Sequence, residues 1–478
     1  MVDIRSQHSI DEKRSRELGK EDIGKLLLRF YLPAFAGVMV NSLHNIVDRI
    51  YIGQGVGSVA LSGISIVFPI IILYTAFGML IGSGAAVRIS LNLGRGDKKR
   101  AEKVLGTAVV MVLITALLLT VAGLMLRSTV LNIYGAGQET FEYAYGYITI
   151  IMGGSTFGML GFSLNNMIRS EGSLKVAMYS MFISAGLNIV LDPIFIFALD
   201  MGVEGAAIAT VLSQIALTVW VLLHFRSKRS VIRLRLPNLR IDPGIARYIM
   251  VIGFAPFSMH IAGSVVHWLF NIQLIEYGGD IAVGAMGIIN SVTIMLIMSI
   301  VSINMASQPI IGFNYGAHNY DRVLKTVRAA VRAATLISVG GWLFFLLLPE
   351  TIVGAFNADD MELMKRGVTG LMLYNALLPI VGFQIVASNF FQAIGKPRQA
   401  ILLTLLRQVI VLIPLLIVLP YYLGINGIWL AMPASDVVSG SVSFIFLRKE
   451  IALLKIKEKR CTPLARQRLP QPEGQYIP

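Results

Sequence analysis

Polar residues occur at helical spacing in the apolar stretch GVMVNSLHNIVDRIYIG, near the start of the chain. Asn41, Asn45 and Asp48 are four and then three positions apart, so they would lie on one face of a helix. An ionisable side chain in mid-membrane costs about 2.5–3.5 kcal/mol on insertion scales. Asp48 therefore needs an explanation.

A second polar stripe lies in FISAGLNIVLDPIF, where Ser184, Asn188 and Asp192 follow one another at intervals of four. The neighbouring apolar segments add further polar residues, namely Asn165, Thr210 and Gln214. Lipid cannot satisfy such groups, so we expect them to face a cavity or one another.

The two carboxyl groups could bind a proton or a metal cation. Burial disfavours the ionised form of a carboxyl group, and a second acid close by disfavours it further. Such a group takes up a proton from one side and releases it when a cation arrives or water enters. Na+ is the alternative ion, because carboxylate, amide and hydroxyl oxygens are hard ligands.

Both aspartates also have structural interpretations. Asp48 is followed by Arg49, and the two could form an ion pair at the membrane interface. Asp192 could be a permanently protonated acid bonded to Asn188, with Pro193 serving only to bend the helix.

Composition identifies the kind of protein that carries these residues. Of 478 residues, 55% are hydrophobic and only 14% are charged, whereas soluble proteins carry about 25% charged residues. Charge is confined to short stretches between long apolar blocks, which is typical of a multi-pass membrane protein. The single cysteine, Cys461, excludes a disulfide within the chain. We attribute the net charge of +14 to basic loops and expect no nucleic-acid partner.

Twelve apolar blocks are long enough to cross a bilayer, which predicts an all-α integral membrane protein. They lie near 27–52, 60–87, 104–126, 143–167, 174–199, 205–225, 248–275, 281–311, 328–348, 367–391, 400–422 and 425–447.

The loop charges predict the orientation. Lys and Arg concentrate in alternate loops, as in GRGDKKRAEK, whereas the opposite loops carry mostly acids such as Glu139, Asp280 and Asp359. The positive-inside rule then puts both termini in the cytoplasm. We expect an uncleaved N-terminal tail over 1–24, a first lobe over 25–225, a basic linker over 226–243, a second lobe over 244–447 and a C-terminal tail over 448–478.

The chain repeats itself at a spacing of roughly 222 residues. LGRGDKKRAEKVL matches YGAHNYDRVLKTV, and MGVEGAA matches LGINGIW. Equivalent loops carry the same charge, so the repeats are parallel and predict two pseudo-symmetric six-helix lobes. The segment that matches Asn188–Asp192 falls in VIVLIPLLIV, which is wholly apolar. Because the acids are found in one half only, we predict that the ion-responsive site lies in the first lobe.

Several motifs in this order resemble the multidrug and toxic compound extrusion (MATE) family over about residues 20–450. They are NIVDRIYIGQGVGSVALSGIS, GSGAAVRISLNLGRGDKKRAEKV, RSEGSLKVAM, LNIVLDPIFIFALDMGVEGAAIATVLSQ, FNYGAHNYDRV and FQAIGKPRQA. The resemblance implies a cation-coupled antiporter in a prokaryotic plasma membrane. Such a protein exports amphipathic, mostly cationic compounds by alternating access, needs no cofactor or resident metal, and is expected to be monomeric in contact with lipid.

The resemblance also implies residue roles. Asp48, Asn188, Asp192 and Thr210 resemble the family's cation cluster, for H+ or Na+, and the absence of a mid-span acid on the seventh and eighth spans resembles the DNA-damage-inducible branch. Pro33 and Pro193 are expected to act in gating. The expected cavity lining consists of Met39, Asn41, Asn45, Asn165, Ser184, Gln214, Trp268 and Met298.

Two other classes of function compete with this interpretation. A lipid-linked oligosaccharide flippase shares the two-lobe plan, but its cleft should carry several arginines for a pyrophosphate, and Arg407 is the only clear mid-span one here. We expect Arg407 to extend toward the cytoplasm, with a substrate or ion-pair role as the alternative. An enzyme is disfavoured because the chain has no His-Glu-x-x-His and no Gly-x-Ser-x-Gly motif.

Overall fold

The computed structural model describes residues 16–134, 137–356 and 360–467, and this part of the chain is helical with no strand. The predicted tail over 1–24 falls outside the described residues as far as residue 15, and so do Asp359 and the end of the predicted C-terminal tail. The side chain of Cys461 lies outside the description as well.

The first half of the chain folds into six membrane-length helices, consistent with the first six predicted spans. They are α2 (Ile23–Gly55), α3 (Ser58–Gly94), α4 (Lys98–Ile133), α5 (Gln138–Ser170), α6 (Leu174–Pro193), extended by the π-helical turn η1 (Ile194–Ala198), and α7 (Gly202–Arg226). The first helix begins at Asp22, whose carboxylate accepts a hydrogen bond from the Lys25 amide at 3.0 Å.

The second half begins with α8 (Pro243–Gly316), which is capped in the same way by Asp242. It continues with α9 (Tyr320–Leu347), the short α10 (Pro349–Gly354), α11 (Met361–Tyr374), α12 (Leu378–Ala393), α13 (Pro397–Leu405), the π-helical segment η3 (Leu406–Val411), α14 (Leu412–Leu423) and α15 (Ile425–Gln467).

The described helices supply twelve membrane spans. Ten single helices are long and apolar enough to cross a membrane, and α11 with α12, bent by 48°, gives an eleventh span. The helix α8 is 74 residues long and breaks at Gly279, where φ is 64°, so it supplies two spans. Exposed apolar side chains such as Leu117, Leu118 and Met125 on α4 form a surface suited to lipid.

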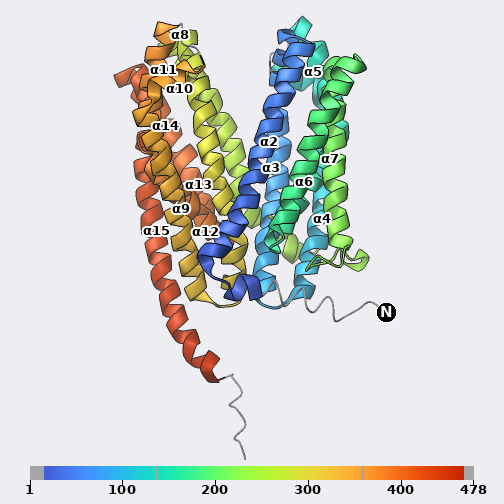
Figure 1. Cartoon of the computed structure of the whole chain (residues 1–478), viewed down its shortest axis with the longest axis vertical. Helices are drawn as coiled ribbons and strands as arrows, with labels where there is room; N and C mark the ends of the chain where they lie inside the picture. Colours follow the sequence, from blue (N-terminus) through green and yellow to red (C-terminus); the bar gives the residue numbers. More distant parts are fainter. Residues whose placement is uncertain (1–15, 135–136, 357–359, 468–478) are drawn as a thin grey trace, which may run out of the picture.

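The helices form two lobes, α2–α7 and α8–α15, that converge at one end and diverge at the other (Figure 1). The converging end carries the start of α2 and the basic loops, and we call it the basic end. The opposite end, with the break at Gly279, is called the acidic end.

Glycines bring the lobes into backbone contact at the basic end. A Cβ placed on Gly94 of α3 would lie 2.0 Å from the Phe313 carbonyl oxygen of α8, and one on Gly316 of α8 would lie 2.2 Å from the Leu91 oxygen of α3. Gly94 and Gly316 are 222 residues apart, and so are Leu91 and Phe313. The sequence repeat therefore appears in space as a pair of equivalent contacts across a pseudo-twofold axis.

Residues that precede the first span strengthen this closure. Leu18 is 2% exposed and packs in a cluster that includes Ile310 and Phe313 of the second lobe. Its carbonyl oxygen accepts hydrogen bonds from Asn314 Nδ2 at 2.9 Å and from Arg322 Nη2 at 3.1 Å. The chain entering the first lobe is thus bound to the second.

The linker between the lobes is bound to the first lobe by a buried acid. Glu171, at the end of α5, lies 2.6 Å from His224 Nε2 and accepts hydrogen bonds from the Ser230 hydroxyl and from the amides of Val231 and Ile232. Burying a carboxylate is costly unless it is fully hydrogen-bonded, so these contacts fix the path of the linker.

Candidate functional site

The structure brings together three of the four residues predicted to bind an ion. The Asp48 carboxyl group on α2 and the Asp192 carboxyl group on α6 are close enough to interact electrostatically. Asn188, one turn before Asp192, donates its Nδ2 to Asp192 Oδ1 at 3.1 Å. Asp192 is fully buried, Asn188 nearly so, and Asp48 is half-buried.

The cluster has more acceptors than donors. Asp48 Oδ1, Asp192 Oδ2 and Asn188 Oδ1 are each buried without a hydrogen-bond partner within the described residues. Buried polar atoms are nearly always hydrogen-bonded in folded proteins, and two ionised carboxylates in contact repel each other. A proton or a metal cation would supply what the set lacks.

Local helix geometry presents Asp192 to its neighbours. Pro193 follows it directly and has no N–H, so the regular hydrogen-bond ladder is interrupted here. The next five residues, Ile194–Ala198, form a π-helical turn. Turns of this kind often mark functional positions in helices, because they free backbone groups and re-aim side chains.

Three features of the surroundings of the two acids bear on the predictions made from the sequence. Thr210 is half-buried on α7 and makes no hydrogen bond to Asp48 or Asp192 within the described residues. Tyr147 on α5, which sequence reasoning missed, interacts electrostatically with both carboxyl groups. Arg49 forms no ion pair with Asp48 in the described part of the chain, and its guanidinium carbon lies 5.4 Å from the Phe68 ring centroid.

The expected cavity-lining polar residues have varied environments. Asn41 and Asn45 are exposed on α2, whereas Asn165 is buried and donates to the Ala177 carbonyl at 3.0 Å and to Ser180 Oγ at 2.7 Å. Asn165 therefore joins α5 to α6. The others range from half-buried to exposed, namely Met39, Ser184, Gln214, Met298 and Trp268.

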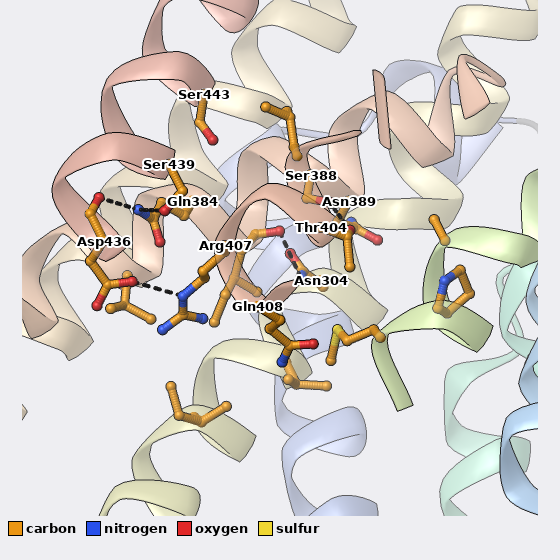
Figure 2. A pocket seen from close by; sticks show the side chains of 18 of the residues that line it. Asn304, Gln384, Ser388, Asn389, Thr404, Arg407, Gln408, Asp436, Ser439 and Ser443 are labelled. Atoms are coloured by element: carbon orange, nitrogen blue, oxygen red, sulfur yellow. Dashed lines mark hydrogen bonds and ion pairs between the residues drawn. The ribbon is translucent and has the colours of Figure 1, made fainter. Parts of the chain in front are cut away.

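A cavity of about 390 Å³ lies mainly in the second lobe. Helices α8, α11, α12, α13 and α15 and the segment η3 line most of it, and α3 and α5 of the first lobe contribute Met79, Ser83 and Asn166. None of the eight residues expected to line a cavity lies on its wall. His267 and Met305 do, and so does a group of polar side chains seen in Figure 2.

Two charged residues form an ion pair on this wall. Arg407 Nε on η3 lies 2.7 Å from Asp436 Oδ1 on α15, and Asp436 is 2% exposed (Figure 2). The expected extension of Arg407 toward the cytoplasm is therefore wrong, and the ion-pair alternative holds. Asp436 also corrects the inference that buried acids occur in the first half alone. It stands in ASDVVSGSVSF, where serines at helical spacing were the signal that could have revealed it.

No group of three or more His, Cys, Asp or Glu side chains suited to a metal occurs within the described residues. Any cation held by Asp48 and Asp192 would thus rely on amide or water oxygens for its remaining ligands.

The MatE family model matches residues 33–194 and 250–418, which include both aspartates of the first-lobe cluster. The chain belongs to the MatE family. It is 26% identical over 410 residues to the multidrug export protein MepA of Staphylococcus aureus, covering 86% of this chain and 90% of that protein. It is 27% identical over 428 residues to the MepA of Staphylococcus haemolyticus, covering 89% and 94%.

A solved structure shares the fold. It is described as the outward-facing conformation of a multidrug resistance MATE family transporter of the MOP superfamily, with 26% identity and a TM-score of 0.87 over 93% of this chain and 99% of that chain. MatE membership makes this chain a membrane transporter rather than an enzyme, with two six-helix lobes.

Proposed function

We propose that this MatE protein is a secondary active exporter of amphipathic, mostly cationic compounds, driven by an inward flow of protons or Na+ through the Asp48–Asp192 cluster. The observation that carries the proposal is the set of three buried oxygen acceptors without donors: Asp48 Oδ1, Asn188 Oδ1 and Asp192 Oδ2. Such a set suits a cation and has no evident value as helix packing.

The export of drugs by the MepA relatives supports the direction of transport. The basic loops favour an orientation with both termini in the cytoplasm, and the bacterial relatives favour a plasma membrane. In that orientation the lobe contact at Gly94 and Gly316 closes the cytoplasmic side, so the described conformation would be open to the outside.

Alternating access would follow if the lobes separated at the basic end and came into contact at the acidic end. In the outward-open state, a proton or Na+ would enter from outside and join Asp48 and Asp192. Neutralising the cluster removes its attraction for a cationic substrate. It also removes the repulsion between the carboxylates, which allows α2 and α6 to pack more closely. We propose that Pro33 and Pro193 are the points at which these helices adjust, since each interrupts helical hydrogen bonding.

The membrane potential suffices as a driving force. A charge moving inward gains about 2.3 kcal/mol per 100 mV. Two protons at roughly 150 mV would yield about 7 kcal/mol, and moving one monovalent cationic substrate outward against the same potential takes back about 3.5 kcal/mol. The remaining ~3.5 kcal/mol supports a substrate gradient of roughly two to three powers of ten.

The flippase alternative is less well supported. The guanidinium of Arg407 is already partly neutralised by Asp436, and a pyrophosphate would require several free cations.

Proteoliposome transport tests the proposal. Ethidium movement would be followed by fluorescence under an imposed proton gradient or an imposed Na+ gradient, for wild type, Asp48→Asn and Asp192→Asn. We expect one gradient to drive transport in wild type and neither to drive it in the variants, because an amide cannot exchange the ion.

Asp200→Asn is the matched control. Asp200 lies eight positions after Asp192, is exposed and has a φ of 51°, which asparagine tolerates. It should transport like wild type. Gradient-driven transport that survives in both Asp48→Asn and Asp192→Asn would show that the acids are structural.

A further inference from the structure

The second-lobe cavity contains an ion pair, Arg407–Asp436, in which the arginine uses only one of its side-chain nitrogens for a hydrogen bond. Arg407 donates through Nε to Asp436, and its two terminal nitrogens have no partner within the described residues. Ser435 Oγ donates to the Arg407 carbonyl at 2.6 Å, and Gln384 Nε2 donates to the Asp436 carbonyl at 2.6 Å. The pair is therefore held firmly by its backbone, while the guanidinium fork is left free.

Four further polar atoms on the same cavity wall have no partner. Asn304 Oδ1, Gln384 Oε1, Asn389 Nδ2 and Gln408 Oε1 are buried and unpaired within the described residues, and all four residues line the cavity (Figure 2). Gln384 itself is only 4% exposed. Unsatisfied buried atoms are uncommon in native proteins, so four around one cavity indicate a polar ligand.

The repeat argues against a purely structural role for the pair. The residues 222 positions before Arg407 and Asp436 are Ala185 and Gln214, so the first lobe builds the same helices without these charges. A buried ion pair is also a poor stabilising device, because desolvation offsets most of its attraction.

The kinds of unpaired atoms specify the ligand. The terminal nitrogens of Arg407 form a planar fork that suits a carboxylate. The free oxygens of Asn304, Gln384 and Gln408 suit a donor such as a protonated amine. Apolar side chains on the same wall, including Ile294 and Ile297, suit a ring system.

We propose that this cavity is a second-lobe substrate site for amphipathic zwitterions, in which Arg407 binds the anionic group and the amide oxygens bind the cationic end. The inference rests on the proposed export function and extends its substrates beyond simple cations. It also assigns the two lobes different tasks, with ion binding in the first and recognition of the anionic group in the second.

Two dyes that differ by one ester test the site. Rhodamine B carries a carboxylate, and its ethyl ester does not. Binding of each would be measured by fluorescence anisotropy to the full-length protein in nanodiscs, with empty nanodiscs subtracted. We expect wild type to bind the zwitterion about tenfold more tightly than the ester, as one charge-assisted hydrogen-bonded contact implies.

Three variants complete the design. Arg407→Gln should lose the preference for the carboxylate. The double variant Arg407→Gln/Asp436→Asn should lose it as well, and it leaves no buried charge unpaired, so it answers the question if the single variant does not fold. Arg366→Gln is the control, because Arg366 pairs with Glu362 and does not line the cavity; the preference should remain.

Equal binding of the two dyes by wild type, or a preference that survives in the double variant, would overturn the inference. Ethidium uptake by the same protein separates this result from the proposed function. If uptake fails under either gradient while the Arg407-dependent preference holds, the coupling proposal falls and the binding site stands.

Discussion

Replacing Gly94 by alanine should shift the protein away from the described conformation. The added Cβ would meet the Phe313 carbonyl oxygen at 2.0 Å, the Phe313 carbonyl carbon at 2.8 Å and the Ala317 nitrogen at 3.0 Å. All three are backbone atoms at the end of α8 or of the residue that follows it, so they cannot move aside as the end of a flexible side chain would.

The size of the effect follows from these distances. Ordinary contact begins at 3.4 Å, so the lobes must separate by about 1.4 Å at this point. Overpacking of this kind costs about 1–3 kcal/mol. The cost applies only where the lobes touch at the basic end, so the ratio of the two conformations should change by about 5- to 150-fold.

Spin-label distances between the lobes measure this ratio. In a Cys461→Ser background, cysteines at Ile133 and Met361 would carry the labels, since both side chains are exposed at the acidic end of different lobes. Wild type should show mainly a long distance. Gly94→Ala should move population to a shorter distance as the acidic end closes.

Two further variants make the experiment specific. Gly316→Ala should act like Gly94→Ala, because its Cβ would meet the Leu91 oxygen at 2.2 Å. Gly287→Ala, also on α8, should have no effect, because nothing lies within 4 Å of its added Cβ. Distances unchanged in both contact variants would refute the view that this glycine contact closes the basic end.

Three other substitutions test further contacts. Glu171→Ala should cost about 3 kcal/mol of stability, because it strands the linker groups that Glu171 satisfies, and thermal unfolding and trypsin cleavage within 226–243 would measure this. Arg322→Ala removes the hydrogen bonds to the carbonyls of Leu18 and Glu21, so the label distances should shift in the same direction as in Gly94→Ala. Asn165→Leu should lower the melting temperature by a few degrees without changing which dyes are transported, because Asn165 joins two helices rather than lining the cavity.

Each of these three substitutions has a control variant or a result that would contradict the expectation. Glu142→Ala removes an exposed acid and should leave the linker resistant to trypsin, whereas equal resistance in Glu171→Ala would contradict the linker contact. Lys325→Ala, which removes an exposed ion pair with Asp321, should leave the label distances unchanged. An altered range of transported dyes in Asn165→Leu would indicate that Asn165 lines the path of the substrate.

The fold could be predicted well from the sequence, because membrane spans and their repetition are one-dimensional properties. The match of LGRGDKKRAEKVL to YGAHNYDRVLKTV predicted the two lobes, and the equivalent contacts of Gly94 and Gly316 follow from the same register. The cluster of Asn188 and Asp192 was predictable for a similar reason, since i,i+4 spacing places residues on one face of any helix.

The cavity was not predictable in this way. Which face of a span borders a cavity depends on how the lobes tilt, and periodicity carries no information about that tilt. Asp436 was not predicted because the repeat matches it to Gln214. The positions of the second half that match Asp48 and Asp192 therefore do not lead to it. Arg407 was misplaced because its partner lies 29 positions later in the chain, and pairs of that kind become visible only in three dimensions.

Ion release on substrate binding tests the coupling role of Asp48 and Asp192 most directly. Purified wild type would be titrated with ethidium in weakly buffered solution containing a pH indicator, and in parallel with Na+ as a competitor. We expect ethidium to displace protons from wild type, or to compete with Na+ for it, and we expect neither effect in Asp192→Asn. Ethidium that binds to wild type without releasing protons and without sensing Na+ would contradict a coupling role for Asp48 and Asp192.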